Sequence, residues 1–187
     1  MLVLKSASPR RKEILEKLGL KLQISPSYID ESQAKNEDFF SYLRRVTVAK
    51  LEIPKISEHN NVYVASDTIV VLNEKIFPKP SSLEECFSFL KELSSKIHSV
   101  FSSLAIYKKS QVIYDFDETR VQMKNWSEKE IWEYIKTANP LDKAGGYGIQ
   151  DTNSPVESFK GSFTNVLGFP IQKFFQYSEV WQEHLYN

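Results

Sequence analysis

Short apolar runs, separated by polar stretches and turn-forming residues, predict the strands of a sheet. The strongest run is residues 62–72, which are rich in β-branched side chains and nearly continuous in apolar character, as in a strand buried on both faces. Leu2–Leu4 is a shorter run of the same kind. Residues 100–107 and 111–114 indicate a hairpin, and residues 119–123 indicate a further strand.

Apolar residues at helical spacing predict helices between these strands. Ser8 followed by Pro9 is typical of an N-cap with proline at the first helical position, and Gly19 is placed to end that helix. A serine followed three residues later by a glutamate marks two further helix starts, at Ser82 and Ser127. We expect helices over residues 9–18, 39–51, 82–93 and 127–139, and a last one that opens at Pro170.

The order of these elements predicts the fold class. Strands and helices interleave without a repeat or an obvious linker, so we expect one α/β domain over residues 1–187, with a mixed central sheet flanked by helices. A chain of 187 residues is long enough for one hydrophobic core. An α/β domain of two lobes is also compatible with this length.

Composition excludes several classes of partner. Lys plus Arg and Asp plus Glu each total 24, so there is no general basic field to hold a nucleic-acid polymer, and an anionic ligand must be held by a few positioned groups. Cys86 is the single cysteine, which excludes an internal disulfide and a multi-cysteine zinc site and indicates a packing residue. No run approaches the ~20 apolar residues of a membrane span, so we expect a cytoplasmic protein that does not bind a membrane.

Two arginines in the first turn of the first helix form a candidate anion site. Arg10 and Arg11 stand where the helix dipole is already positive and carboxylates are preferred, at a cost of roughly 0.3–1 kcal/mol per charge. A phosphate would relieve that cost, because the exposed backbone N–H groups, the Ser8 hydroxyl and the two guanidinium groups all suit it. The alternative is that both arginines point into solvent or pair with acidic residues, and the pattern leaves both interpretations open.

Asp67 lies inside the apolar run 62–72, where a carboxylate costs several kcal/mol unless it is paired or bound to metal. We therefore expect Asp67 at a strand end or bulge that faces a cleft. There it could hold a hard cation such as Mg²⁺, or accept a proton from water. The alternative is a structural aspartate that caps a turn or pairs with lysine. Glu31 is a weaker candidate, because an acidic loop pair is usually just solvated.

Three lysines and a glutamine complete the candidate set. Lys79 stands between two prolines that stiffen its backbone, which suits a fixed charge for phosphate, although an exposed lysine in a proline turn is the commoner case. Lys50, in a helix, is uninformative alone. Residues 142–150 combine flexible glycines with Lys143 and with Gln150, whose amide offers a donor and an acceptor to a base edge. This segment has neither the Walker nor the dinucleotide-binding spacing.

Taken in order, these segments resemble the Maf family of nucleoside triphosphate pyrophosphatases, which is related in fold to the inosine triphosphatases. Several ordered motifs at compatible spacing, over nearly the whole chain, make the resemblance specific. The matching segments are Ser6-Ala7-Ser8-Pro9-Arg10-Arg11, Asp30-Glu31, Ala49-Lys50, Ser66-Asp67-Thr68, Lys79-Pro80, Leu93-Ser94, His98-Ser99-Val100, Asp142-Lys143-Ala144-Gly145-Gly146-Tyr147-Gly148-Ile149-Gln150, Gly161-Ser162 and Asn165-Val166-Leu167-Gly168-Phe169-Pro170.

The resemblance implies two lobes around a cleft, and hydrolysis between the α and β phosphates to give a nucleoside monophosphate and pyrophosphate. Asp67 would be the proton acceptor that activates water. The same resemblance implies a homodimer and a divalent cation, Mg²⁺ or Mn²⁺, with Glu31 and Asp67 as its ligands. The implied phosphate-binding residues are Ser8, Arg11, Lys50, Lys79 and Lys143.

Base preference is implied by three positions, Arg10, Thr68 and Gln150, which resemble the branch of the family that acts on dTTP and UTP. Modified pyrimidine nucleotides are plausible substrates too. The branch that acts on 7-methyl-GTP carries tryptophan, glutamine and glutamate at these positions instead. Asp151 departs from the family pattern, because it replaces the glycine after Gln150 and puts a negative charge beside the expected base-recognising segment.

Two alternatives to this enzyme stay open. The first is a nucleotide-binding regulator of cell division and septation without significant turnover, a role to which the family has been linked. The second is a phosphatase that releases orthophosphate. Metal-dependent turnover across a panel of nucleotides separates the enzyme from the regulator, and the identity of the product separates the pyrophosphatase from the phosphatase.

Overall fold

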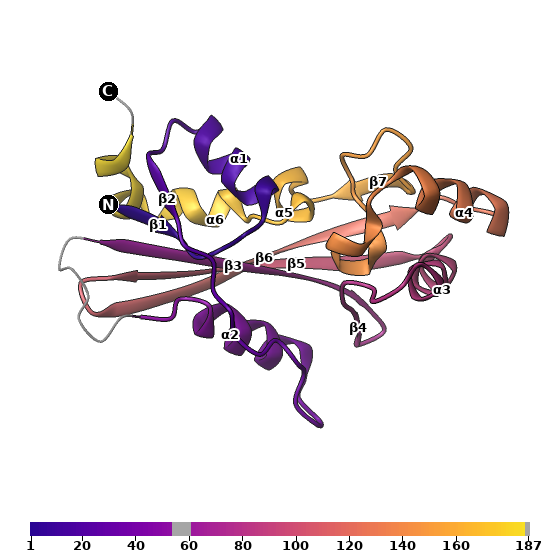
Figure 1. Ribbon diagram of the computed structural model, residues 1–187, viewed down its shortest axis with the longest axis horizontal. Helices are drawn as coiled ribbons and strands as arrows, with labels where there is room; N and C mark the ends of the chain where they lie inside the picture. Colours follow the sequence, from indigo (N-terminus) through magenta and orange to yellow (C-terminus); the bar gives the residue numbers. More distant parts are fainter. Residues whose placement is uncertain (54–60, 186–187) are drawn as a thin grey trace. The chain divides into compact units, whose positions relative to one another are not determined.

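The computed structural model describes residues 1–53 and 61–185, and the chain forms two compact units. Unit 1 consists of Met1–Asp67, Ser102–Asp117 and Gly168–Asn187, and unit 2 of Thr68–Phe101 and Glu118–Leu167. Figure 1 follows the chain in colour, from indigo at the N-terminus to yellow at the C-terminus. The expectation of a single domain over residues 1–187 stays a prediction.

In unit 1 the N-terminal strand is the central strand of a parallel arrangement. β1 (Leu2–Leu4) pairs in parallel with β2 (Leu22–Ile24) on one side and with the start of β3 (Val62–Leu72) on the other. Parallel neighbours need a crossover connection, and α1 (Pro9–Lys17) supplies it between β1 and β2 and packs beside β2 (Figure 1). The strand predicted at residues 2–4 is therefore confirmed.

The long helix of unit 1 is α2 (Phe39–Ala49), which begins where Asp38 caps it. The Asp38 carboxylate accepts hydrogen bonds from the backbone N–H groups of Phe40 and Ser41 at 3.0 and 3.1 Å, which satisfies two amides that have no partner within the helix. The short helices α6 (Ile171–Gln176) and α7 (Ser178–Trp181) follow near the C-terminus. One core cluster of this unit is formed by Val3, Leu51, Tyr63, Ala65 and Ala105.

Unit 2 adds antiparallel pairs to the sheet. β4 (Lys75–Phe77) pairs antiparallel with the end of β3, and β7 (Val156–Lys160) pairs antiparallel with β6 (Gln111–Met123). β5 (Ile97–Lys108) stands between β3 and β6 in the strand order. Because β1 has parallel neighbours, the sheet is mixed, and the predicted α/β class with a mixed sheet flanked by helices is confirmed.

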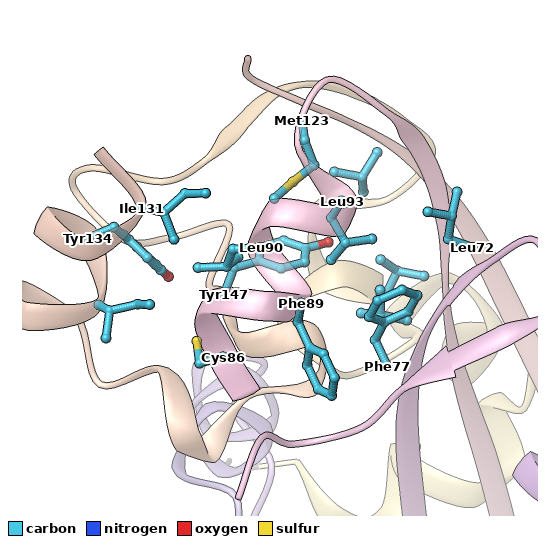
Figure 2. Packing of buried hydrophobic residues seen from close by; sticks show 14 residues of the cluster. Leu72, Phe77, Cys86, Phe89, Leu90, Leu93, Met123, Ile131, Tyr134 and Tyr147 are labelled. Carbon is cyan, nitrogen blue, oxygen red and sulfur yellow. The ribbon is translucent and has the colours of Figure 1, made fainter. Parts of the chain in front are cut away.

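The core of unit 2 forms around α3 (Leu83–Leu93), with α4 (Glu128–Thr137) and α5 (Phe163–Leu167) as the other helices. Figure 2 shows Cys86, Phe89, Leu90 and Leu93 of α3 among the side chains of this cluster. The Phe77 and Phe89 rings meet edge to face with centroids 5.3 Å apart. Burial raises the pKa of the Cys86 thiol to about 11, so the residue packs as an unreactive small apolar group, as predicted.

Several predicted boundaries are confirmed. β3 covers residues 62–72 and α3 ends at Leu93, as expected. The Ser127–Glu130 capping box is complete, whereas at α3 the box is half formed, since the Glu85 carboxylate accepts from Ser81. Short 3₁₀ turns cover Pro140–Asp142, Ala144–Gly146 and Gln182–His184. Within the described residues, every helix is too short or too polar to cross a lipid bilayer.

Other expectations about local structure were wrong. Residues 119–123 are not a separate strand, because β6 begins at Gln111 and continues through the polar residues 115–118 to Met123. Residues 161–169 fall outside every predicted helix, and the structure has α5 there. The strands β2 and β7 carry little alternation between apolar and polar residues, and the sequence pattern missed both.

Truncation of Phe77 tests the core of unit 2. Phe77 is fully buried, so Phe77→Ala should lower the free energy of unfolding by about 3–5 kcal/mol, because a cavity is left beside Phe89. Phe163→Ala makes the same change at a ring that is 42% exposed and should cost about 1 kcal/mol or less. Urea denaturation followed by circular dichroism measures both, and equal losses would contradict this packing.

Candidate functional site

The start of α1 is built as the sequence predicts. Ser8 is the N-cap residue, Pro9 opens the helix, and the first turn contains no acidic residue. The Ser8 side chain makes no capping hydrogen bond, while its backbone N–H donates to the Ser6 hydroxyl at 3.2 Å. The Ser8 hydroxyl is therefore not used to satisfy the N–H groups of the first turn, which suits a helix start that receives an anion.

Arg11 turns inward from this helix start. Its Nε donates to the backbone carbonyl of Gly168 at 2.8 Å, and its Nη1 donates to the Ser6 hydroxyl at 3.2 Å. The Ser66 hydroxyl of β3 donates to the same Gly168 carbonyl at 3.2 Å. The interpretation in which Arg11 points into solvent is therefore wrong, and its guanidinium group is held in one orientation.

The electrostatic surroundings of Arg11 place it near the acidic candidates of unit 1. Burial lowers the pKa of the Arg11 guanidinium, and its neighbour Arg10 lowers it further, whereas the carboxylates of Asp67 and Glu31 raise it. The arginines can attract a phosphate group, and the carboxylates of Asp67 and Glu31 can attract a cation that accompanies it. This set of charges therefore suits a phosphate ligand that binds together with a cation.

The Lys50 ammonium joins those two carboxylates. Lys50 is the C-cap residue of α2, and its Nζ lies 2.6 Å from Asp67 Oδ1 and 3.1 Å from Glu31 Oε1. The side chains of Lys50 and Asp67 are 8% and 12% exposed, so this pair is largely withdrawn from water. Asp67 was expected at a strand end or bulge, and the strand-end position was wrong: it is the sixth of the eleven residues of β3. The strand continues because Lys50 compensates the charge.

Buried hydroxyl groups support this arrangement, and sequence reasoning missed them. The Ser103 hydroxyl donates to the backbone carbonyl of Asp67 at 3.3 Å and lies 2.5 Å from the Thr47 hydroxyl of α2. The Tyr42 hydroxyl donates to the carbonyl of Glu31 at 2.9 Å. Burial, with Asp67 and Glu31 next in order, raises the pKa of Tyr42 to about 12, so it stays a donor at neutral pH. Polar residues on the apolar face of a helix, such as Thr47, were the available signal.

The donor set bears on which metal could bind. Across residues 1–53 and 61–185, no group of three or more His, Cys, Asp or Glu side chains is arranged to hold a metal ion. Glu31 and Asp67 nevertheless supply two carboxylates, which both form an ion pair with Lys50. Mg²⁺ commonly binds one or two carboxylates together with phosphate oxygens of a substrate. The residues present therefore fit a cation that arrives with a phosphate ligand, and they do not form an all-protein cage.

In unit 2, the glycine-rich segment packs closely against the segment that contains Lys79. The N–H of Gly145 donates to the carbonyl of Pro78 at 3.0 Å. Gly146 has a φ of +72°, and a Cβ on it would lie 2.7 Å from Cys86 Sγ, so a side chain fits neither the backbone nor the space. Lys79 itself is exposed, directly after Pro78.

The remaining candidates of unit 2 lie on the glycine-rich segment. Lys143 is 9% exposed, and its Nζ lies 3.2 Å from Asp142 Oδ1 and 3.9 Å from Asp151 Oδ2, and donates to the carbonyl of Asn139. This ammonium is thus turned onto carboxylates of its own segment. Gln150 is exposed on the same segment.

The predicted site residues fall into two groups. Unit 1 brings Arg10, Arg11, Glu31, Lys50 and Asp67 into electrostatic contact and also contains Ser8 at the start of α1. Unit 2 contains Thr68, Lys79, Lys143 and Gln150, and Thr68 directly follows Asp67 in β3.

Comparison with known proteins finds a matching family model and relatives of similar sequence. A family model described as Maf-like protein matches residues 1–179. A dTTP/UTP pyrophosphatase of Leptospira biflexa serovar Patoc is 49% identical over 97% of this chain and 94% of its own. Proteins with the same name are 45% identical in Leptospira borgpetersenii serovar Hardjo-bovis (99% of this chain, 98% of its own) and 39% identical in Thermosipho africanus (92% and 88%).

Among solved structures, the Ham1 protein of Staphylococcus aureus is a distant match. It has a TM-score of 0.47 and 10% sequence identity, and the match covers 66% of this chain and 72% of that chain.

A double-mutant cycle on Lys50 and Asp67 tests the buried ion pair. Lys50→Met, Asp67→Asn and the double variant should give a coupling free energy on the order of 1–3 kcal/mol. Lys50→Met leaves the buried Asp67 carboxylate without its ammonium partner, and Asp67→Asn leaves Lys50 only the half-exposed carboxylate of Glu31. Lys75 and Glu92 are the matched control, since their charged atoms are also 2.6 Å apart but their side chains are 53% and 40% exposed.

For Lys75→Met and Glu92→Gln the coupling should stay below about 1 kcal/mol. Urea unfolding of both sets supplies the measurement. Couplings of equal size in the two pairs would show that Lys50 and Asp67 interact as solvated surface charges do.

Proposed function

This chain belongs to the Maf family, and on that basis we propose that it is a nucleoside triphosphate pyrophosphatase that hydrolyses dTTP and UTP to the monophosphate and pyrophosphate. Relatives that carry the name dTTP/UTP pyrophosphatase, at 39–49% identity over nearly the whole chain, support both the reaction and the base. The observation that carries the proposal is the Asp67 carboxylate, held by Lys50 at 2.6 Å in the middle of a buried strand and beside Glu31 and Arg11.

In the proposed reaction, Asp67 accepts a proton from the water that attacks the phosphoanhydride between the α and β phosphates. The nucleoside monophosphate takes the oxygen of that water, and pyrophosphate leaves. Lys50 and Arg11 offset the charge that develops on the phosphate oxygens, and Arg11 needs little reorganisation because Gly168 already holds its guanidinium group.

A divalent cation, Mg²⁺ or Mn²⁺, would be held by the carboxylates of Glu31 and Asp67 together with phosphate oxygens of the substrate. When bound, such a cation neutralises the triphosphate and orients it for attack. Lys50 contacts the same two carboxylates, so it keeps them together and restrains both side chains.

The remaining candidate residues are proposed to bind phosphate or to recognise the nucleobase. Ser8, Lys79 and Lys143 would bind phosphate, and of these Lys143 must exchange its present carboxylate partners for the ligand. The residues proposed to select the base are Arg10, Thr68 and Gln150. The exposed Gln150 amide can donate to O4 and accept from N3–H of thymine or uracil.

Replacement of Asp67, the proposed proton acceptor, tests the proposed reaction. Asp67→Asn keeps the size of the side chain and removes its basicity, so kcat for dTTP should fall by about 10²–10⁴-fold. Chromatography of the products from dTTP, UTP, CTP and dGTP, in Mg²⁺ or Mn²⁺ and after chelation, gives the measurement. We expect pyrophosphate as the product and a loss of turnover in chelator.

Asp115→Asn is the control, since Asp115 is also paired with a lysine in unit 1, at 3.2 Å from Lys173, and is outside the proposed site. Wild-type release of pyrophosphate by Asp67→Asn would refute the mechanism. Orthophosphate as the product would indicate a phosphatase, and nucleotide binding without turnover would indicate a regulator.

We also propose that the protein is a cytoplasmic homodimer. Unit 1 exposes the rings of Phe40 and Phe116, which lie 5.4 Å apart and are 43% and 36% exposed, and exposed aromatic pairs are common at interfaces. Light scattering after size-exclusion chromatography should give twice the chain mass of 21.7 kDa. A variant with Phe40→Ser and Phe116→Ser should shift towards the mass of a single chain. A wild-type protein that stays monomeric at high concentration would contradict the proposal.

A further inference from the structure

One buried hydroxyl joins both ends of the turn that presents Gln150. Residues 148–151 form a four-residue turn in which the N–H of Asp151 donates to the carbonyl of Gly148 at 3.3 Å. The Tyr134 hydroxyl accepts from the N–H of Gly148 at 2.9 Å and donates to Asp151 Oδ2 at 2.5 Å. Gln150 is the third residue of this turn, so its backbone is fixed from both sides.

Ser154 closes the segment a second time. Its hydroxyl donates to the carbonyl of Gly148 at 2.8 Å, and its N–H donates to the carbonyl of Asp151 at 3.0 Å. The first and last residues of the turn are therefore each held by both Tyr134 and Ser154. These bonds leave the Gln150 side chain as the exposed part of a restrained backbone.

Gly148 and Asp151 are matched to each other. A Cβ on Gly148 would lie 2.6 Å from Asp151 Oδ1 and 2.7 Å from Oδ2, so the carboxylate occupies the space that a side chain would need. The backbone of Gly148 is outside the left-handed region, so the glycine is required for space. An alanine at 148 would have to displace the carboxylate from Tyr134.

The Asp151 carboxylate interacts with residues of unit 2 outside the turn. Its carboxylate accepts from Tyr134, and Lys143 Nζ lies 3.9 Å from Oδ2. Burial is the main cause that raises the pKa of the Tyr134 hydroxyl, and the hydrogen bond to Asp151 raises it further. The hydroxyl therefore remains a donor at neutral pH. The negative charge that the sequence places next to Gln150 is thus directed at the body of unit 2.

Tyr134 is itself fixed by packing. It is 2% exposed, it projects from α4, and Figure 2 shows it in the core cluster together with Ile131 from the same helix. Its ring lies 5.4 Å from that of Trp126, and α4 begins with a complete capping box at Ser127. A hydroxyl on so restrained a ring can set the position of a surface turn.

We propose that Tyr134 and Asp151 are positioning residues for base selection: together they fix the turn on which Gln150 meets the base. The inference rests on the proposed function, in which Gln150 recognises the pyrimidine edge. Thymine and uracil present an acceptor at position 4, and cytosine presents a donor there. A displaced Gln150 amide would distinguish these patterns less well, because discrimination through hydrogen bonds depends on their geometry.

Loss of the Tyr134 hydroxyl gives the sharpest test. In Tyr134→Phe, the ratio of kcat/KM for dTTP to that for CTP should fall roughly three- to tenfold, with a raised KM for dTTP and a kcat within about twofold of wild type. Asp151→Gly should lower the same ratio. Asp151→Asn keeps an oxygen acceptor for Tyr134 and should restore it.

Tyr177→Phe is the matched control. It removes the same kind of bond, from a tyrosine hydroxyl to Asp115 Oδ2 at 3.1 Å in unit 1, and should leave the dTTP/CTP ratio unchanged. Hydrogen exchange should be faster at the Asp151 amide in Tyr134→Phe than in wild type. An unchanged exchange rate together with an unchanged ratio would overturn the proposal.

Other outcomes separate this inference from the proposed function. If Gln150→Ala loses discrimination while Tyr134→Phe keeps it, the positioning role is refuted and the pyrophosphatase stands. If Gln150→Ala keeps discrimination as well, Gln150 does not select the base, and the inference fails with that role while dTTP hydrolysis stands. If wild-type protein releases no pyrophosphate from any nucleotide, the proposed function itself fails and the inference fails with it.

A second pair of variants tests the structural basis without any assay of activity. Gly148→Ala should lower Tm in the wild-type chain by more than it does in the Asp151→Gly background, where no carboxylate fills the space. Equal shifts in Tm in the two backgrounds would overturn the match between Gly148 and Asp151.

Discussion

A buried ammonium group shared by two carboxylates is the interaction on which unit 1 depends. Lys50 connects the end of α2 with the middle of β3 and with the loop that contains Glu31. Without it, Asp67 would leave an uncompensated charge in a strand whose residues, apart from Thr68, are all buried. The same contact keeps a carboxylate ready beside Arg11. One ion pair therefore serves both the folding of the strand and the chemistry proposed for it.

Much of the fold could be predicted from local pattern. Continuous apolar character was enough for β3, and serine N-caps were enough for the starts of α1, α3 and α4. The pattern failed where pairing with neighbours decides the structure. β6 keeps its strand conformation through Asp115, Asp117 and Glu118 as part of a sheet in which β5 is its hydrogen-bonded neighbour. β2 and β7 have too little apolar character to be detected.

The candidate site was predictable as a list of residues and less so as an arrangement. Asp67 and the arginines stood out because each breaks a local rule, and such conflicts mark functional positions. The hydroxyl groups of Tyr42, Thr47 and Ser103 gave only a weak signal, since a polar residue near an apolar run is common and its partners are distant in sequence. Lys143 was expected to bind phosphate, and sequence spacing could not show that carboxylates already surround it.

The space shared by Gly148 and Asp151 has a consequence for how this chain can change over time. The two positions constrain each other: the Asp151 carboxylate can keep its present position against Tyr134 only while position 148 remains glycine. A lineage that acquires a side chain at 148 first loses access to the aspartate, whereas one that acquires the aspartate first is bound to the glycine. Residues around such a turn can thus become fixed by the order in which they were substituted.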